Sequence, residues 1–305
     1  MDEIDLRMFK HLIRNPRMTF RELADELSIS LQAVHRRMQL AQDKGVIAKF
    51  TADISLGYLN ATTAVIFGES SIRSLDDIIS HLSDNDHTSW ILIGSGNYLY
   101  VGGLLRSIEE LEEYSDFVIK KAQITNPTIG LQTFHAGGIF GGGTHAESFS
   151  KLSKLDLRII KSLHDDARKS LTVIADELAV SARTVRRRLG KMIEDSVIEL
   201  GVVLNPTKSG DTLAVLEISL AEGSDKNEVK HFLSERFFIE VDFFRSFSNL
   251  PNFLMGVVWT FSLAELGDLV KELEGIEQIE SAVPIVLYSG HYFGTWRTTL
   301  LESKE

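Results

Sequence analysis

The sequence contains no cysteine and only 5 prolines among its 305 residues. Without cysteine the chain can form no disulfide bond, no cysteine-ligated zinc site and no thiolate nucleophile. No apolar run approaches the roughly 18 residues that a membrane-spanning helix needs, and the acidic start MDEIDLR lacks the apolar stretch of a signal peptide. We therefore expect a cytoplasmic protein without a membrane partner, and 44% hydrophobic residues suffice for several packed domains.

Positive charge is also scarce over the whole chain, whose net charge of −11 argues by itself against a nucleic-acid partner. Its distribution changes that interpretation. Residues 1–50 hold 9 Lys and Arg against 7 Asp and Glu, and residues 151–200 hold 11 against 8, whereas residues 51–150 and 201–305 are each −8. Because attraction to phosphate depends on local patches, two mildly basic segments on an acidic body are compatible with DNA binding.

The two basic segments are copies of each other. ADELSISLQAVHRRM at 24–38 returns as ADELAVSARTVRRRL at 175–189, and residues 4–47 align without a gap onto residues 155–198. Of the 44 aligned positions 16 are identical, among them Arg17/Arg168 and Arg37/Arg188. Such internal similarity predicts a duplicated structural unit.

Each copy has the periodicity of three helices with a short connection between the second and the third, as in a helix-turn-helix. Thr19 and Glu22 form the T-x-x-E pattern of a capping box at the start of the second helix. Ser30 and Ser181 are placed to cap the third helix of their copies. Gly45 can end the first of these third helices in a left-handed conformation, and VIAKFTADI after it predicts a strand or wing.

The third helix of such a module enters the major groove of DNA. An arbitrary helical bundle is the simpler interpretation, but a purely structural helix has no need to repeat exposed arginines in both copies. We expect base contacts from different residues in the two copies, because glutamine suits adenine and arginine suits guanine. The predicted DNA-binding residues, for base edges or phosphate, are Arg17, Ser30, Gln32, His35, Arg36, Arg37, Arg168, Ser181, Arg183, Arg186, Arg187 and Arg188.

After each copy the patterns follow the order β-α-β-β-α-β, which is typical of a ferredoxin-like unit. The predicted fold class is therefore α+β, with two winged helix-turn-helix domains and two ferredoxin-like (βαββαβ) domains in tandem. The predicted boundaries are 1–55 and 151–206 for the helix-turn-helix domains, 56–134 and 207–305 for the ferredoxin-like domains, and 135–150 for a glycine-rich linker.

The chain resembles the Lrp/AsnC family of transcription regulators, twice over. The motifs that carry the resemblance are IDLRMFKHL…R…ELADELSIS…VHRRM…KGVI and LDLRIIKSL…R…IADELAVS…VRRRL…DSVI. It implies two fused protomers, each with a DNA-binding domain and a ligand-sensing domain, that form a pseudo-dimer within one chain. Double-stranded DNA, a small-molecule effector and further homo-oligomerisation are the implied partners, and no cofactor or catalytic activity is expected.

The family's effector turn, a Gly-x-Tyr-Asp-like stretch, is altered in both halves. Here it is GSGNYLY and NLPNFLM, with Leu99 and Leu254 where the acid would lie. Without that carboxylate we expect an effector other than a free α-amino acid. The predicted effector-binding residues are Gly94, Gly96, Asn97, Tyr98, Asn252 and Phe253.

Three further patterns have competing interpretations. Five glycines within residues 137–143 suggest a phosphate loop, but no Lys-Ser/Thr follows, and a linker is the expected interpretation. HLSDNDH at 81–87 has the residue types of a metal site, yet Asp and Asn are common in turns, and we expect no metal. The alternative function is a siroheme decarboxylase of the same fold: VDFFRSFSNLPNFL keeps Arg245 of that family's His-Asn-Tyr-x-Arg-like stretch but has no histidine.

Overall fold

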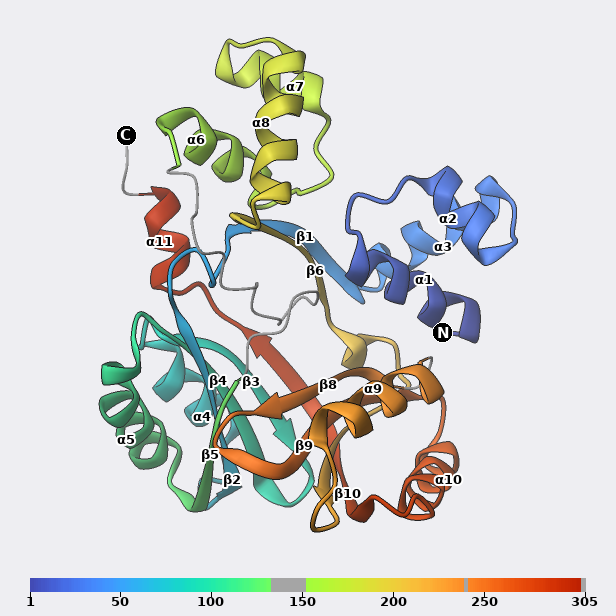
Figure 1. Ribbon diagram of the computed structural model, residues 1–305, viewed down its shortest axis with the longest axis vertical. Coiled ribbons are helices and arrows are strands. Elements are labelled where there is room, and N and C mark those ends of the chain that lie inside the picture. Colours follow the sequence, from blue (N-terminus) through green and yellow to red (C-terminus); the bar gives the residue numbers. More distant parts are fainter. Residues whose placement is uncertain (133–151, 239–240, 303–305) are drawn as a thin grey trace. The chain divides into compact units, whose positions relative to one another are not determined.

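The computed structural model describes residues 1–132, 152–238 and 241–302, so the predicted linker at 135–150 and its glycines lie outside the described residues. Two compact units emerge (Figure 1). One contains the two helix-turn-helix modules, strands β1 and β6, and the last helix, α11. The other contains the two ferredoxin-like halves. Among the described residues no helix is long and apolar enough to cross a membrane.

Both helix-turn-helix modules have the predicted three helices, and their apolar positions form the core of each module. Val34 and Met38 are 0% and 3% exposed, and their equivalents Val185 and Leu189 are 0% and 4% exposed, as the periodicity predicts. The first module comprises α1 (Glu3–Arg14), α2 (Phe20–Leu27) and α3 (Leu31–Asp43), and the second α6 (Lys154–Leu163), α7 (Leu171–Leu178) and α8 (Ala182–Glu194).

The helix ends follow from local sequence. At the start of α2 the Thr19 amide donates to the Glu22 carboxylate at 2.7 Å and the Glu22 amide donates to the Thr19 hydroxyl at 3.2 Å, which confirms the capping box. Beyond α3, Gly45 has φ +72°, as predicted, and after α8 its equivalent, Ser196, adopts the left-handed region at φ +52°. A serine at that position carries strain that glycine avoids.

The strand after each module pairs with the strand of the other module rather than folding back on its own helices. Strand β1 (Ile47–Ile54) and strand β6 (Ile198–Leu204) form an antiparallel ribbon in which Phe50 lies opposite Val202. Helix α11 (Trp296–Glu302) joins this unit through Arg297, which donates to the Ile54 carbonyl at 2.6 Å and pairs with Glu199 at 2.5 Å. The predicted second ferredoxin-like domain, 207–305, thus includes a helix that packs with the helix-turn-helix unit.

Both ferredoxin-like halves have the predicted β-α-β-β-α-β order, with α4 (Leu75–Ser83) and α5 (Leu111–Ala122) in the first and α9 (Lys226–Arg236) and α10 (Leu263–Glu274) in the second. Their strands join into one sheet of order β5-β2-β4-β3-β10-β7-β9-β8. The strands are β2 (Thr62–Ser70), β3 (Thr88–Gly94), β4 (Tyr98–Leu105), β5 (Ile124–Leu131), β7 (Thr212–Leu220), β8 (Val241–Phe247), β9 (Leu250–Thr260) and β10 (Ile279–Tyr292).

The two halves meet at both edges of their sheets. Strand β10 pairs with β7 of its own half and then, from Leu287 onward, with β3 of the other half. At the opposite edge Gln132 bridges to Phe247, and the Leu131 amide donates to the Asn249 side chain at 2.8 Å. Within the described residues the end strands β5 and β8 are thus joined only at this corner, and they remain the two edges of the eight-stranded sheet.

Each half packs its helices on one sheet face and shares the other face with its partner half. The helix-side cores include Leu99 in the first half and Leu254 in the second, both 0% exposed. On the other face Phe67 stacks on Tyr100 at 5.6 Å and on Phe253 at 5.7 Å, and lies 6.3 Å from Phe247. We call these four rings, which come from both halves, the aromatic layer.

Candidate nucleic-acid interface and effector site

The exposed faces of α3 and α8 carry the residues predicted for base contacts. Ser30 caps α3 by accepting from the Ala33 amide at 3.1 Å, and Ser181 caps α8 by accepting from the Thr184 amide at 3.1 Å, so both predicted caps are confirmed. All six predicted base-contact side chains are exposed: Gln32, His35 and Arg36 on α3 and Arg183, Arg186 and Arg187 on α8.

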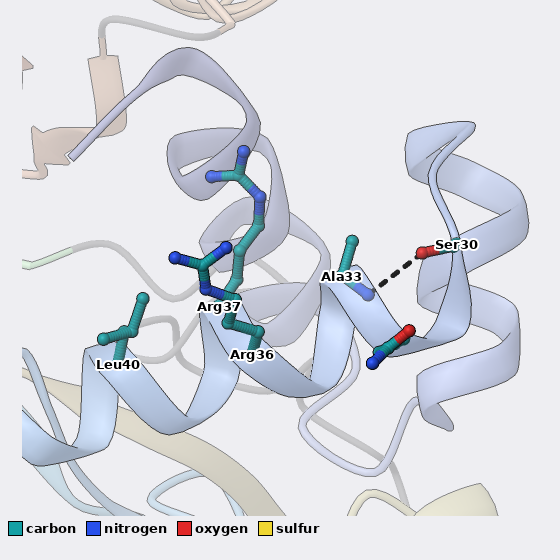
Figure 2. A pocket seen from close by; sticks show the side chains of 6 residues that line it. Ser30, Ala33, Arg36, Arg37 and Leu40 are labelled. Atoms are coloured by element: carbon teal, nitrogen blue, oxygen red, sulfur yellow. Dashed lines mark hydrogen bonds between the residues drawn. The ribbon is translucent and has the colours of Figure 1, made fainter.

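A pocket lies along α3, and the residues that line it, drawn in Figure 2, are Ser30, Gln32, Ala33, Arg36, Arg37 and Leu40. No acidic residue lies in the first turn of either α3 or α8. The positive end of the helix dipole and the arginines therefore act in the same direction, which favours an anionic ligand such as the DNA backbone. On α3 the His35 ring packs edge-on against Phe20 at 4.3 Å, which restricts its orientation.

Arg37 and Arg188, two of the predicted phosphate ligands, are engaged inside their own modules. Arg37 pairs with Asp5 of α1 at 2.8 Å, and Arg188 pairs with Asp156 of α6 at 3.0 Å. The two carboxylates are largely buried, with side chains 10% and 12% exposed. These pairs bind the third helix to the first, and they give a structural reason for the identity of this arginine in both copies.

The contribution of the Arg188–Asp156 pair to stability depends on pH. Burial alone would raise the pKa of Asp156, but hydrogen bonds from Ser153 and the ion pair with Arg188 outweigh it and lower that pKa. A carboxylate with a lowered folded pKa stabilises the fold above the pKa of an unfolded Asp, and the stabilisation is lost as pH falls through the folded pKa. The Arg188–Asp156 pair is thus a stabilising contact at neutral pH.

Arg17 and Arg168 lie in the loops before α2 and α7. Each is half-buried and donates hydrogen bonds to backbone carbonyl oxygens of the other module. These contacts give the two residues a structural role between the modules, which the sequence did not predict.

The predicted effector residues fall into two groups in the ferredoxin-like unit. Gly94, Gly96 and Asn97 form the turn between β3 and β4, where Gly96 and Asn97 have φ +69° and +56°. Gly94 packs under β10, since a Cβ there would lie 2.5 Å from Ile285. Asn252 is exposed on β9.

Tyr98 and Phe253 of that set lie at the aromatic layer. Tyr98 is 5.2 Å from Tyr100, and Phe253 stacks on Phe67. The structure therefore connects one predicted residue from each half through the rings of two residues that the sequence did not single out.

Glu217 on β7 is a functional candidate that sequence reasoning missed. The Tyr100 hydroxyl donates to its carboxylate at 2.8 Å, and Tyr98 also hydrogen-bonds to it. Burial raises the pKa of Glu217, an effect that the two tyrosine hydroxyls partly oppose, and burial together with the carboxylate raises the pKa of both tyrosines. Glu217 is the only charged residue in TLAVLEISL, a signal that was available in the sequence.

Arg245 on β8 is buried, with 5% of its surface exposed. Its guanidinium donates to the Gln132 side chain and lies 5.4 Å from the Trp90 ring and 4.8 Å from the Phe243 ring. Burial lowers its pKa. Its contacts are thus those of a packed cation between aromatic rings.

The HLSDNDH segment forms a hydrogen-bonded network. His87 contacts Glu110 at 2.9 Å and Asp86 at 3.1 Å, and Arg106 pairs with Asp86 at 2.7 Å. Within the described part of the chain no group of His, Asp and Glu has the arrangement of a metal site.

Comparison with known proteins supports the class that these features define, a DNA-binding transcription regulator. A winged helix-turn-helix DNA-binding family model matches residues 1–48 and 152–199. The HTH-type transcriptional regulator PH0061 of Pyrococcus horikoshii is 33% identical over 129 residues, which cover 40% of this chain and 87% of that protein. The HTH-type transcriptional regulator Ptr1 of Methanocaldococcus jannaschii is 30% identical over 142 residues, 45% of this chain and 96% of that protein.

The chain belongs to the HTH-type transcriptional regulators, and the two matches of the winged helix-turn-helix model agree with the tandem Lrp/AsnC-like form that the sequence predicts. The relatives match less than half of this chain while almost their whole length is covered, in agreement with the duplication. A solved structure of the siroheme decarboxylase NirDL aligns with 98% of this chain and 97% of its own at a TM-score of 0.59 and 12% identity, which shows a shared fold.

Replacing Arg188 with alanine should destabilise the helix-turn-helix unit by about 1–3 kcal/mol, because Asp156 loses its cation in a largely buried place. The matched variant Arg187→Ala, one residue earlier on the exposed face, should change the free energy of unfolding by less than about 0.5 kcal/mol. Urea unfolding followed by circular dichroism measures both. The difference between them should shrink in acid, and equal small effects at neutral pH would mean that Arg188 is available to DNA.

Proposed function

We propose that the chain is a sequence-specific regulator whose two modules recognise different half-sites of one DNA duplex. The observation that supports this most directly is the pair of capped helices with unlike exposed residues. The α3 helix presents a glutamine, a histidine and an arginine where α8 presents three arginines. Because α8 is the more basic and arginine suits guanine, its half-site should be guanine-richer and the more tightly bound.

The proposal narrows the set of residues that touch DNA. The exposed arginines Arg36, Arg183, Arg186 and Arg187 supply phosphate or base contacts, whereas the four arginines engaged inside the unit act through the fold. One chain then supplies a pseudo-dimer, and we propose that chains assemble further into homo-oligomers. Action on DNA agrees with the cytoplasmic location expected from the sequence.

DNA affinity should fall steeply with salt, with log K decreasing by about 0.9 for each phosphate that the protein neutralises. Arg187→Ala should reduce this slope by about one phosphate equivalent, because its side chain is exposed on α8. Gel-shift titrations over a salt series measure the slope, with Arg188→Ala as the control that keeps it. Salt-independent binding by the unmodified chain would contradict the proposal.

The Arg183→Gln substitution should change the base preference of one half-site only. It places on α8 the residue that α3 carries at the equivalent position, Gln32, and each good bidentate contact is worth roughly 1–3 kcal/mol of discrimination. Selection of bound sequences from random duplexes reports both half-sites at once. A strictly palindromic consensus for the unmodified chain would rule out unlike half-sites.

We propose further that a small molecule modulates binding from the ferredoxin-like unit, at the aromatic layer, which includes Phe253, and beside it at Tyr98 and Glu217. The half-buried carboxylate favours a cationic or neutral polar group, because it would repel the carboxylate of a free α-amino acid. Aromatic rings beside a carboxylate provide the two features that bind an organic cation. The turn residues Gly94, Gly96, Asn97 and Asn252 are proposed as the mouth of this site.

The alternative function is a siroheme-decarboxylase-like enzyme, and the observation in its favour is the shared fold with NirDL. What supports a non-enzymatic role is that the relatives with higher identity are named transcriptional regulators. The guanidinium of Arg245, the residue that the chain shares with the decarboxylase motif, hydrogen-bonds to Gln132 in a buried place.

Calorimetric titration separates these ligand classes. The twenty amino acids should give no binding heat at micromolar concentration, because the α-carboxylate of each zwitterion is repelled by Glu217 and offsets the attraction of its ammonium group. The Glu217→Gln variant removes the negative charge with little change in shape, and it should weaken a cationic ligand while leaving DNA affinity in the ligand-free state unchanged. Micromolar binding of an amino acid would contradict the proposed site, and micromolar binding of an iron porphyrin would favour the decarboxylase.

A further inference from the structure

The loops that lead into α2 and α7 are joined by two arginines in a reciprocal arrangement. Arg17 and Arg168 occupy equivalent positions of the two copies, and each guanidinium hydrogen-bonds the two carbonyl oxygens that flank the other arginine in the sequence. The acceptors are the backbone oxygens of Ala167 and of Lys169, at 3.2 Å, for Arg17, and those of Pro16 and Met18, at 2.7 and 2.8 Å, for Arg168. We call these four hydrogen bonds the arginine clasp.

The two arginines of the clasp differ in their further contacts. Arg168 lies 5.0 Å from the Phe20 ring and 5.1 Å from the Phe50 ring, so its guanidinium packs between aromatic rings as well as donating hydrogen bonds. At the positions equivalent to these phenylalanines the other copy has Leu171 and Gly201, which offer Arg17 no ring. Arg168 should therefore contribute more to the clasp than Arg17.

The electrostatics show that this arrangement is costly and specific. Burial lowers the pKa of both arginines, and Arg17 lowers that of Arg168 further, while Asp166 opposes the shift in both. Two like charges held close together need fully directed hydrogen bonds to be stable. Each guanidinium donates to its two carbonyl oxygens from two separate nitrogens of one rigid plane, whereas the ammonium group of a lysine must donate from a single atom and cannot keep this geometry. The two copies both have arginine at this position because each arginine hydrogen-bonds to the loop of the other copy.

We propose that Arg17 and Arg168 are positioning residues that fix the spacing and rotational phase of the two recognition helices, α3 and α8. This inference rests on the proposed DNA-binding function. Each clasped loop leads directly into α2 or α7, and these helices pack on α3 and α8 respectively. The preferred distance between half-sites is then set by two side chains that do not touch DNA.

The test varies the number of base pairs between the two selected half-sites. Half-sites lie on one face of DNA when their centres are about 10 base pairs apart, so 5 added base pairs should weaken binding of the unmodified chain about 10-fold or more. In Arg168→Lys this penalty should shrink to about 2–3-fold, with affinity for a single half-site and the salt slope unchanged. Arg17→Lys should show the same effect more weakly.

The Arg168→Lys substitution keeps the positive charge, so it distinguishes a role in the arginine clasp from a role as a phosphate ligand. The inference is overturned if Arg168→Lys keeps the full loss of affinity at the longer spacing. It is also overturned if Arg168→Ala reduces the salt slope by about one phosphate equivalent and Arg168→Lys restores that slope. Arg187→Ala is the matched control, because it should weaken binding equally at every spacing.

A measurement without DNA keeps the clasp testable if the proposed function fails. The chain has no cysteine, so Leu40→Cys and Lys191→Cys, at equivalent exposed positions of α3 and α8, accept spin labels selectively. The distance distribution between the labels should be narrow and should broaden in Arg168→Lys. An unchanged distribution contradicts the clasp, whereas broadening without any DNA binding contradicts only the proposed function.

Discussion

Antiparallel strand pairing between the two copies is the interaction on which both units depend. In the helix-turn-helix unit β1 pairs with β6, and in the ferredoxin-like unit β3 pairs with β10. These ladders satisfy backbone groups that a single copy would leave at open strand edges. A single copy is therefore incomplete in this structure, and the duplication supplies in one chain the pairing that a separate protomer would otherwise provide.

In a homodimer both copies must have the same sequence, and covalent fusion removes this constraint. Comparison of equivalent residues shows where the two copies have diverged. The contacts inside each module are the same in both copies, as in the ion pairs formed by Arg37 and Arg188 with equivalent aspartates. The contacts between copies are partly asymmetric, since Arg168 has two aromatic neighbours and Arg17 has none at the equivalent positions. The surfaces of the third helices differ most. In a symmetric dimer each change would appear twice, and here each can serve one half-site.

Much of the fold was predictable because its signals are local. Capping residues such as Ser30 and Thr19, the left-handed Gly45 and the helical periodicity depend on neighbours within a few residues, and the structure confirms them. The roles of the arginines were not predictable, since burial of Arg188 or Arg168 depends on groups 32 and 150 residues away. Glu217 was missed for the same reason: its tyrosine partner is 117 residues distant in the chain. The sequence shows that the residues at these positions are charged, but it does not show which groups the charged side chains contact.

The central claim is that the two modules of one chain act as unlike halves of a single DNA reader. A hydroxyl-radical footprint on the selected duplex tests it most directly. The unmodified chain should protect two backbone segments about one helical turn apart. A chain with Gln32→Ala and Arg36→Ala, which removes two exposed side chains of α3 alone, should lose protection of one segment and keep the other. Equal loss of both segments, as expected if two chains present the same helix to both half-sites, would contradict the claim.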